Sequence, residues 1–338
     1  MFTWIQFLLY LLCCFYFCCF LFLLAQAAAR VALTSKKANN VLLTFRAANI
    51  MEATVWFPVL SWFFTALGLV GNSFVILLIT SKKQLIHQTT NWFLLSLSFA
   101  DLGVSLSIIP GEFFCFSSKQ CHFVLLASFQ WDFLYASVVN LCMLTLDRYI
   151  AIVKPFIYVL MMSKSRVMAS ICAAWIVPFT FCFIPFTFIY SEHHLTAMRN
   201  YTYFMVVAFE FLPVFILILA TGHMIFIARK HAHEVASVAA QLRYNHPTAE
   251  GGNAAPLQQE NRRRSSVLFI TAIVLFFVFC YSVTIALSFC SIFELCAVPR
   301  ALELVKKLLL IANSAFNPFV YGFLKHDVKR EVKQLLRI

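Results

Sequence analysis

Charged residues are rare in the apolar stretches of this sequence, and the few that occur are the first candidates for chemistry. Asp147 and Arg148, followed by Tyr149, close an apolar run that begins near Phe123, and Asp101 lies in the middle of an earlier run. A charge at a bilayer centre costs roughly 2.5–3.5 kcal/mol on insertion scales, so such residues pair or face a protein interior. We therefore expect Asp147 and Arg148 at a membrane boundary and Asp101 in a functional polar site, with a hydrogen-bonded packing acid as the alternative.

Histidines and nucleophiles give no comparable site. The pair His193-His194 and the pair His231 and His233 could bind a metal, but no further ligands converge on them in the sequence. An intramembrane enzyme would need a nucleophile with a base or a set of metal ligands, and no HExxH or GxSxG pattern occurs. We expect no catalytic residues, no enzyme activity and no organic cofactor.

The composition indicates which elements must position these residues. Of 338 residues, 62% are hydrophobic and 12% are charged, and the mean hydropathy is +0.84. A membrane-spanning helix needs about 20 apolar residues. Seven apolar runs have this length, at residues 56–80, 91–114, 122–149, 167–190, 202–228, 266–289 and 304–323. The expected fold is an all-α membrane protein, a seven-transmembrane helix bundle in contact with the lipid bilayer.

The net charge of +12 reflects topology. Most of the 26 Lys and Arg residues fall in connections on one side of the bundle, whereas the three opposite loops hold only Lys119, Arg199 and Arg300. Cytoplasmic loops carry an excess of Lys and Arg, so the N-terminus is expected outside the cell and the C-terminus in the cytoplasm. Nucleic acid is not an expected partner. The sequon at Asn200 then lies in an extracellular loop and can accept a glycan.

The two ends of the chain differ from the apolar runs. Residues 1–50 are expected to be a leader or signal-peptide-like segment plus an N-terminal tail, although the positively charged start of a signal peptide is missing. An uncleaved extra helix and a start at Met51 are the alternatives. Residues 51–323 form the expected membrane domain, with a mobile cytoplasmic loop at 229–265. Residues 324–338 alternate basic and apolar residues, which is typical of a short amphipathic helix on the membrane surface, followed by a short tail.

Several motifs resemble those of the rhodopsin-like (class A) G-protein-coupled receptors. The stretch LCMLTLDRYIAIVKP, which ends at Pro155, is similar to the end of the third family helix, and NSAFNPFVY, which ends at Tyr321, is similar to that of the seventh. Gly71-Asn72, LSFADL around Asp101, Trp175 and Pro213 resemble the motifs of the first, second, fourth and fifth helices. The resemblance covers residues 56–336. It implies an extracellular ligand and a heterotrimeric G protein as partners.

The resemblance also implies two internal sites. One is a sodium pocket that would hold an allosteric sodium ion, with the residues Asp101, Ser137, Asn313 and Asn317. The other carries activation and G-protein coupling, with the residues Asp147, Arg148, Tyr149, Pro318 and Tyr321. No other metal site is expected.

The outer residues are less typical of the family. Gln130 takes the place where aminergic members carry an ammonium-binding Asp, and Asp132 is expected to point at a neighbouring helix. The tentative ligand-binding residues are Glu112, Gln130, Leu134, Glu210, Tyr281 and Lys307. A mutual ion pair with Glu112 or Glu303 is the alternative role for Lys307. A small amine is slightly preferred as the ligand over a peptide or an anionic lipid.

Other departures from the family pattern affect activation and folding. Val283 replaces the family proline of the sixth helix, which predicts a smaller kink. Arg263 stands where many members carry an acid that tethers the Arg of the third helix, so we expect ligand-free activity. Residues 191–201 lack the family cysteine, and Cys115 with Cys121 or Cys290 with Cys296 could instead close local loops. A transporter or channel is the alternative function, although no internal repeat is visible.

Overall fold

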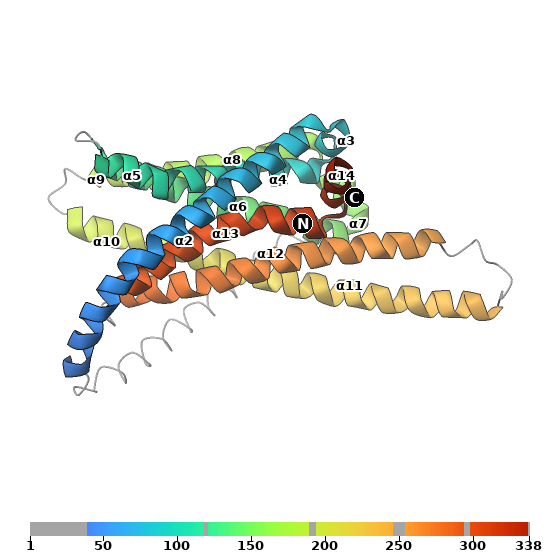
Figure 1. Ribbon diagram of the computed structural model, residues 1–338. Coiled ribbons are helices and arrows are strands. Elements are labelled where there is room, and N and C mark those ends of the chain that lie inside the picture. The colour runs from blue at the N-terminus through green and yellow to red at the C-terminus, as the bar shows by residue number, and fades with distance from the viewer. Residues whose placement is uncertain (1–38, 118–120, 189–193, 246–253, 294–297, 337–338) are drawn as a thin grey trace.

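A computed structural model describes residues 39–117, 121–188, 194–245, 254–293 and 298–336 (Figure 1). Within these residues all secondary structure is helical. The helices are α2 (Asn39–Ser81), α3 (Lys83–Ile86), α4 (Thr89–Ser107), α5 (Ile109–Ser117), α6 (Phe123–Val153), α7 (Pro155–Met161), α8 (Lys164–Phe183), α9 (Pro185–Phe188), α10 (His194–Met205), η1 (Val206–Phe211), α11 (Leu212–Asn245), α12 (Ala254–Ile292), α13 (Arg300–Leu324) and α14 (His326–Leu336).

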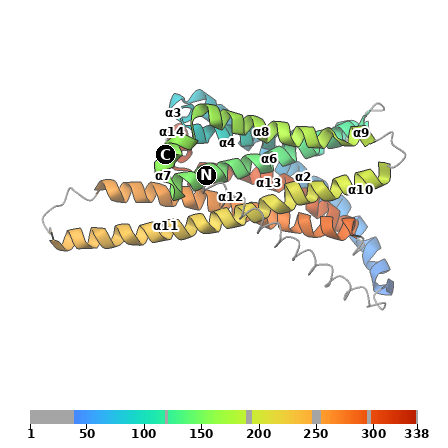
Figure 2. The same cartoon turned by 180° about the vertical axis from the view of Figure 1, so that it is seen from behind.

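Seven helical segments make up the bundle: α2, α4 with α5, α6, α8 with α9, α10 with η1 and α11, α12, and α13. Six helical stretches among the described residues are long and apolar enough to cross a membrane. The seventh segment, α13, is less apolar because it carries Lys306, Lys307, Asn313 and Asn317. Seen from behind, α6, α8 and α11 run along the bundle (Figure 2). The expected all-helical bundle is confirmed.

Prolines account for several changes of helix geometry, because proline has no backbone N–H and clashes with the preceding turn. The helix α6 ends just before Pro155, which begins α7, and α8 ends just before Pro185, which begins α9. The wide π-helical turn η1 lies immediately before Pro213. The helix α12 continues without a break past Val283, where the family proline is missing, and α13 continues through Pro318 as well.

The helices extend beyond two of the expected boundaries, while the division into leader, membrane domain and tail stays a prediction. The segment 229–265 was expected to be a loop, but α11 continues to Asn245 and α12 begins at Ala254. Residues 229–245 contain no Gly or Pro and include four Ala and two Arg, which favour helix. The two helices extend past the end of the bundle side by side (Figure 1). The expected boundary at residue 50 falls inside α2, which begins at Asn39, and residues 1–38 lie outside the described part.

The core lies between the helices, and the outer faces are apolar. Large side chains such as Phe93, Phe269 and Phe277 are fully buried between helices. Other apolar side chains face outward, and Val70 and Val159 are 72% and 79% exposed. Outward-facing apolar surface of this extent is what a lipid environment requires.

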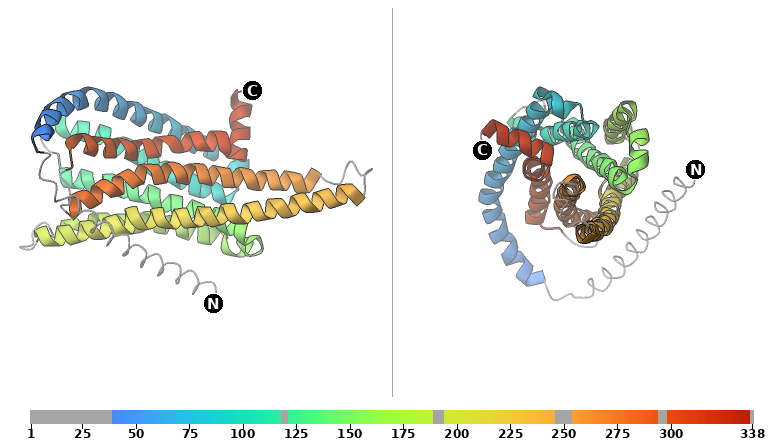
Figure 3. Two further views of the ribbon diagram at one scale, coloured as in Figure 1. Left: turned by 90° about the horizontal axis from the view of Figure 1, so that it is seen from below. Right: turned by 90° about the vertical axis from the view of Figure 1, so that its right-hand side faces the viewer.

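The short helix α14 turns away from the axis of α13 and lies across the end of the bundle (Figure 3). Its Val328 is buried, and Glu331 forms an ion pair with Lys82 at 3.6 Å. Arg330 donates a hydrogen bond to the Gln84 side chain at 3.1 Å. The expected amphipathic helix is thus attached to the connection between α2 and α4.

Candidate functional site

The middle of the bundle holds a polar cluster around Asp101 of α4. Ser137 of α6 donates a hydrogen bond to Asp101 Oδ1 at 2.7 Å, and Asn317 of α13 donates one to Oδ2 at 2.7 Å. All three side chains are buried. Three helices that are distant in the sequence therefore meet at one carboxylate.

The rest of this region is polar as well, and α2 approaches it closely. Asn72 donates hydrogen bonds to the carbonyl oxygens of Gly68 and Ser314, at 3.0 and 3.3 Å. A Cβ atom at Gly71 would lie 3.0 Å from two ring atoms of Pro318, so a glycine allows α2 and α13 to touch here. Asn313 of α13 is buried as well, but no hydrogen bond joins it to Asp101 within the described residues.

A second network surrounds Asp147 near the end of α6, and this side chain is fully buried. Arg148 folds back onto it, with Nε at 2.9 Å and Nη2 at 2.6 Å from Oδ2. Thr90 of α4 donates to the same oxygen at 3.0 Å, and Tyr158 of α7 donates to Oδ1 at 2.9 Å. Arg148 Nη2 also contacts the hydroxyls of Thr90 and Tyr158. Two further side chains, Thr90 and Tyr158, thus hold the arginine against its neighbouring acid.

Burial raises the pKa of Tyr158, and the negative charge of Asp147 adds to the effect. The Tyr158 hydroxyl therefore keeps its proton and remains a donor. The side chain of Arg263, the residue expected in place of a tethering acid, lies outside the described residues.

An inner cavity of about 230 Å³ opens beside this network. Arg148, Thr90, Phe269 and Lys325 are among its lining residues. The Lys325 ammonium is buried and donates a hydrogen bond to Asn91, a contact that sequence reasoning did not identify.

Other predicted coupling residues surround the same end. Tyr149 shares a hydrogen bond with His223 Nδ1 of α11 at 2.9 Å. Tyr321 is buried with its ring edge-on to Phe269, at a centroid distance of 5.8 Å. Its hydroxyl oxygen has no hydrogen-bond partner within the described residues.

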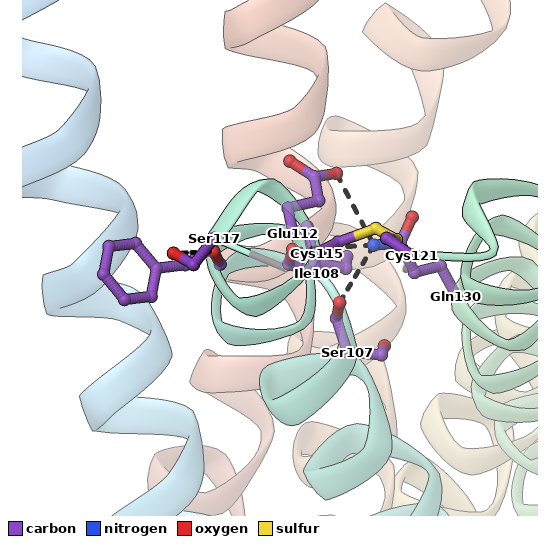
Figure 4. The surroundings of a disulfide bond; sticks show 8 residues. Ser107, Ile108, Glu112, Cys115, Ser117, Cys121 and Gln130 are labelled. Atoms are coloured by element: carbon purple, nitrogen blue, oxygen red, sulfur yellow. Dashed lines mark hydrogen bonds between the residues drawn. A yellow bond between two sulfur atoms is a disulfide. The ribbon is translucent and has the colours of Figure 1, made fainter. Parts of the chain in front are cut away.

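Two of the outer polar residues form an ion pair, and a third contacts it. Lys307 of α13 pairs with Glu112 of α5, the alternative role that the sequence left open for this lysine. Gln130 of α6 donates to Ser107 O at 2.9 Å and lies 3.5 Å from Glu112 Oε1 (Figure 4). The predicted ligand residues Glu112, Gln130 and Lys307 therefore lie together.

Glu210, in contrast, belongs to a separate contact chain. Ser288 of α12 donates to Glu210 Oε2 at 3.3 Å, and the Lys306 ammonium donates to the Ser288 hydroxyl at 2.9 Å. Sequence reasoning missed Lys306 and Ser288, although a second lysine beside Lys307 was a visible signal. Leu134 and Tyr281 are buried in the apolar core, and the ring of Tyr281 stacks on that of Phe277 with 4.2 Å between the ring centroids.

The remaining predictions concern the outer loops and metals. A disulfide joins Cys115 to Cys121 and closes the connection between α5 and α6 (Figure 4). Asn200 is exposed on α10, so a glycan there stays a prediction. Asp132 is buried, and its Oδ1 has no hydrogen-bond partner within the described residues. Among those residues, no group of three His, Cys, Asp or Glu side chains could hold a metal.

Comparison with known families decides what kind of protein combines these features. The family model described as 7 transmembrane receptor (rhodopsin family) matches residues 71–321, which is most of the chain. The chain belongs to the rhodopsin family of seven-transmembrane receptors. It is therefore a multi-pass membrane receptor and not an enzyme, and members of this family act with an extracellular ligand and a G protein.

Similar receptors have names that refer to amines. The 5-hydroxytryptamine receptor 4 of Cavia porcellus is 26% identical to this receptor, with 86% of this chain and 78% of the relative covered. The octopamine receptor beta-2R of Chilo suppressalis is 23% identical over 80% of this chain and 76% of its own length. The trace amine-associated receptor 4 of Mus musculus is 25% identical, with 75% and 77% covered.

Proposed function

We propose that this receptor binds a small amine-bearing molecule at its extracellular end and activates a heterotrimeric G protein at its cytoplasmic end. Its location would be the plasma membrane, with the N-terminus outside and the C-terminus in the cytoplasm. The observation that carries this proposal is the convergence of α4, α6 and α13 on Asp101, which lies between the outer ion pairs and the network of Arg148. Small shifts at one site are amplified where a packed core has two discrete arrangements, and we propose that the cluster at Asp101 is such a place.

The proposed activation step is the release of Arg148 from Asp147. In the present conformation the guanidinium contacts Asp147, Thr90 and Tyr158, so it is not available to a partner. A ligand that favours a second arrangement of the bundle would shift the equilibrium by its difference in affinity for the two states. The guanidinium of Arg148 would then be free to point into the inner cavity. In the present structure Arg148 is part of the wall of that cavity.

An allosteric sodium ion is a further part of the proposal. Asp101, Ser137, Asn313 and Asn317 would hold it, since carboxylate, hydroxyl and amide oxygens suit a hard cation. The ion would supply a positive charge that neutralises Asp101 in the inactive state. Ser314, one turn before Asn317, adds a further buried hydroxyl beside Asp101, and its oxygen suits the same kind of ion.

The amine proposal rests on the relatives and on one acid. The similar receptors are named for 5-hydroxytryptamine, octopamine and trace amines. Gln130 has no charge to offer an ammonium group, but it contacts Glu112, which has one. We propose Glu112 as the carboxylate that receives the amine.

A ligand screen with a second-messenger readout tests this function. Cells that express the receptor would be exposed to a panel of amines, peptides and anionic lipids, and cyclic AMP and calcium would be recorded. The proposal predicts responses to amines that are lost in Glu112→Gln at equal surface expression. Responses only to peptides or lipids, unaffected by Glu112→Gln, would reject the amine.

A further inference from the structure

Four of the charged groups at the outer end of the bundle are matched with one another. Glu112 and Lys307 form a direct ion pair. Glu210 and Lys306 are connected through the Ser288 hydroxyl. Each of these two acids is therefore combined with a lysine into a neutral unit, and neither acid lacks a cationic partner.

The two units differ in how far a ligand can reach them. The side chains of Lys307 and Glu112 are 27% and 25% exposed, so water and small solutes have access to this pair. Glu210 is only 2% exposed and lies between helices. The pair of Glu112 and Lys307 is consequently the one that a ligand can exchange with.

A simple amine would make a poor exchange at this pair. Its ammonium group could replace Lys307 on Glu112, but the displaced lysine would lose the acid that it contacts in this structure. Separating a partly buried ion pair loses the attraction between its charges, and the charge left behind has less water around it than on the surface. A simple carboxylate has the converse problem. It could replace Glu112 on Lys307, but it would leave Glu112 without its lysine partner.

A molecule with both charges avoids this cost. Its ammonium group can bind Glu112 while its carboxylate binds Lys307, so every charge keeps a partner and the net charge of the site is unchanged. Because Glu112 and Lys307 contact each other, a ligand whose two charges lie close together requires the smallest separation of the two side chains.

The surrounding structure keeps the acid in place for such an exchange. Gln130 is anchored on the Ser107 carbonyl oxygen and contacts Glu112 from α6. Cys115 lies one turn after Glu112 on α5, and its disulfide to Cys121 ties α5 to the segment that leads into α6 (Figure 4). Glu112 and Gln130 are thus held close together from two helices.

We infer that the ligand is a small zwitterion of the α-amino-acid type, which binds by opening the Glu112–Lys307 ion pair and replacing both of its halves. This inference deepens the proposed function, and it rests on that proposal because it assumes an amine-bearing ligand at Glu112.

Matched pairs of an amine and its amino acid test the inference, because the two molecules differ only by a carboxylate. The pairs are tyramine with tyrosine, tryptamine with tryptophan, and 5-hydroxytryptamine with 5-hydroxytryptophan. G-protein activation would be titrated in cells that express the full chain, with surface expression measured for each variant. The variants are Lys307→Met, Lys306→Met as the neighbouring control, Lys307→Arg, and the charge swap Glu112→Lys with Lys307→Glu.

The wild-type receptor is expected to respond to at least one amino acid at a concentration about tenfold or more below that of its amine, which corresponds to roughly 1.4 kcal/mol. In Lys307→Met, Glu112 has no lysine partner and the ligand's carboxylate has no cation to bind. The amine should therefore act at a lower concentration than its amino acid. Lys306→Met and Lys307→Arg should keep the wild-type order. The charge swap should keep it as well, and Lys307→Arg preserves the test if the swapped protein does not reach the surface.

Two results would overturn the inference in different ways. If amines act on the wild type at equal or lower concentrations than their amino acids, and Lys307→Met does not change the order, the zwitterion is wrong while the amine receptor stands. If neither member of any pair acts on the wild type or on any variant, the proposed amine ligand fails together with the zwitterion.

Discussion

Removing the Tyr158 hydroxyl should raise the ligand-free activity of the receptor. In the structure this hydroxyl donates to Asp147 Oδ1 at 2.9 Å and also contacts Arg148. Tyr158→Phe would leave Oδ1 of the buried Asp147 without its donor. A hydrogen bond to a charged group contributes about 1.5–3 kcal/mol. If the bond exists only in the inactive arrangement, its loss shifts the ratio of active to inactive receptor by about tenfold or more.

The assay is G-protein activation in cells without added ligand, compared at equal surface expression. Tyr201→Phe is the matched control, because the Tyr201 hydroxyl donates at 3.1 Å to the Phe181 carbonyl oxygen, away from Arg148. Tyr158→Phe should raise the basal signal, and Tyr201→Phe should leave it at the wild-type level. An unchanged or lower basal signal in Tyr158→Phe would refute the idea that this hydroxyl holds Arg148 in an inactive position.

Three further predictions concern other parts of the bundle. Asp101→Asn should abolish any effect of sodium on ligand binding, measured as ligand affinity in sodium and in a large organic cation; a persisting sodium effect would exclude the pocket. Gly71→Ala should lower the free energy of unfolding by about 1–3 kcal/mol, because its new Cβ meets the rigid ring of Pro318 at 3.0 Å. Gly322→Ala is the control, because nothing lies within 4 Å of its new Cβ. Equal melting temperatures of Gly71→Ala and Gly322→Ala would contradict the steric reasoning. Burial lowers the pKa of Lys325 from its ordinary 10.5 to about 7, with Arg148 adding to the effect. The unfolded chain then binds more protons than the folded one between these values, so the melting temperature should rise with pH above 7, and Lys325→Met should flatten that rise.

The sequence predicted the bundle because a long apolar run in a membrane has few alternatives to a helix. It also indicated that Asp101, Ser137 and Asn317 would face one another, since each follows a motif with a fixed place on its helix. The structure brings these three side chains together, while their role with sodium stays a prediction. The contacts of Tyr158 with Asp147 and Arg148 were not predicted, because its position in α7 depends on how the chain turns after Pro155.

The lateral pairing of charges was harder to predict. Helical periodicity directed Lys307 inward, but it could not decide between Glu112 and Glu303 as its partner, because the choice depends on the distance between helices. Lys306 was missed because adjacent helical residues point about 100° apart, and only the packing of α12 brings Ser288 beneath it. The segment 229–245 was misread because polar composition was taken as a loop signal, although its residues are good helix formers.

The central claim is that this bundle transmits a signal to a G protein through Arg148. The most direct test is nucleotide exchange on purified heterotrimeric G proteins of each class by the receptor in lipid nanodiscs, compared with Arg148→Gln. The wild-type receptor should accelerate exchange on at least one class, and Arg148→Gln should not, at equal amounts of folded protein. Equal exchange by both proteins, or no acceleration of any class in the presence of an activating ligand, would contradict the account.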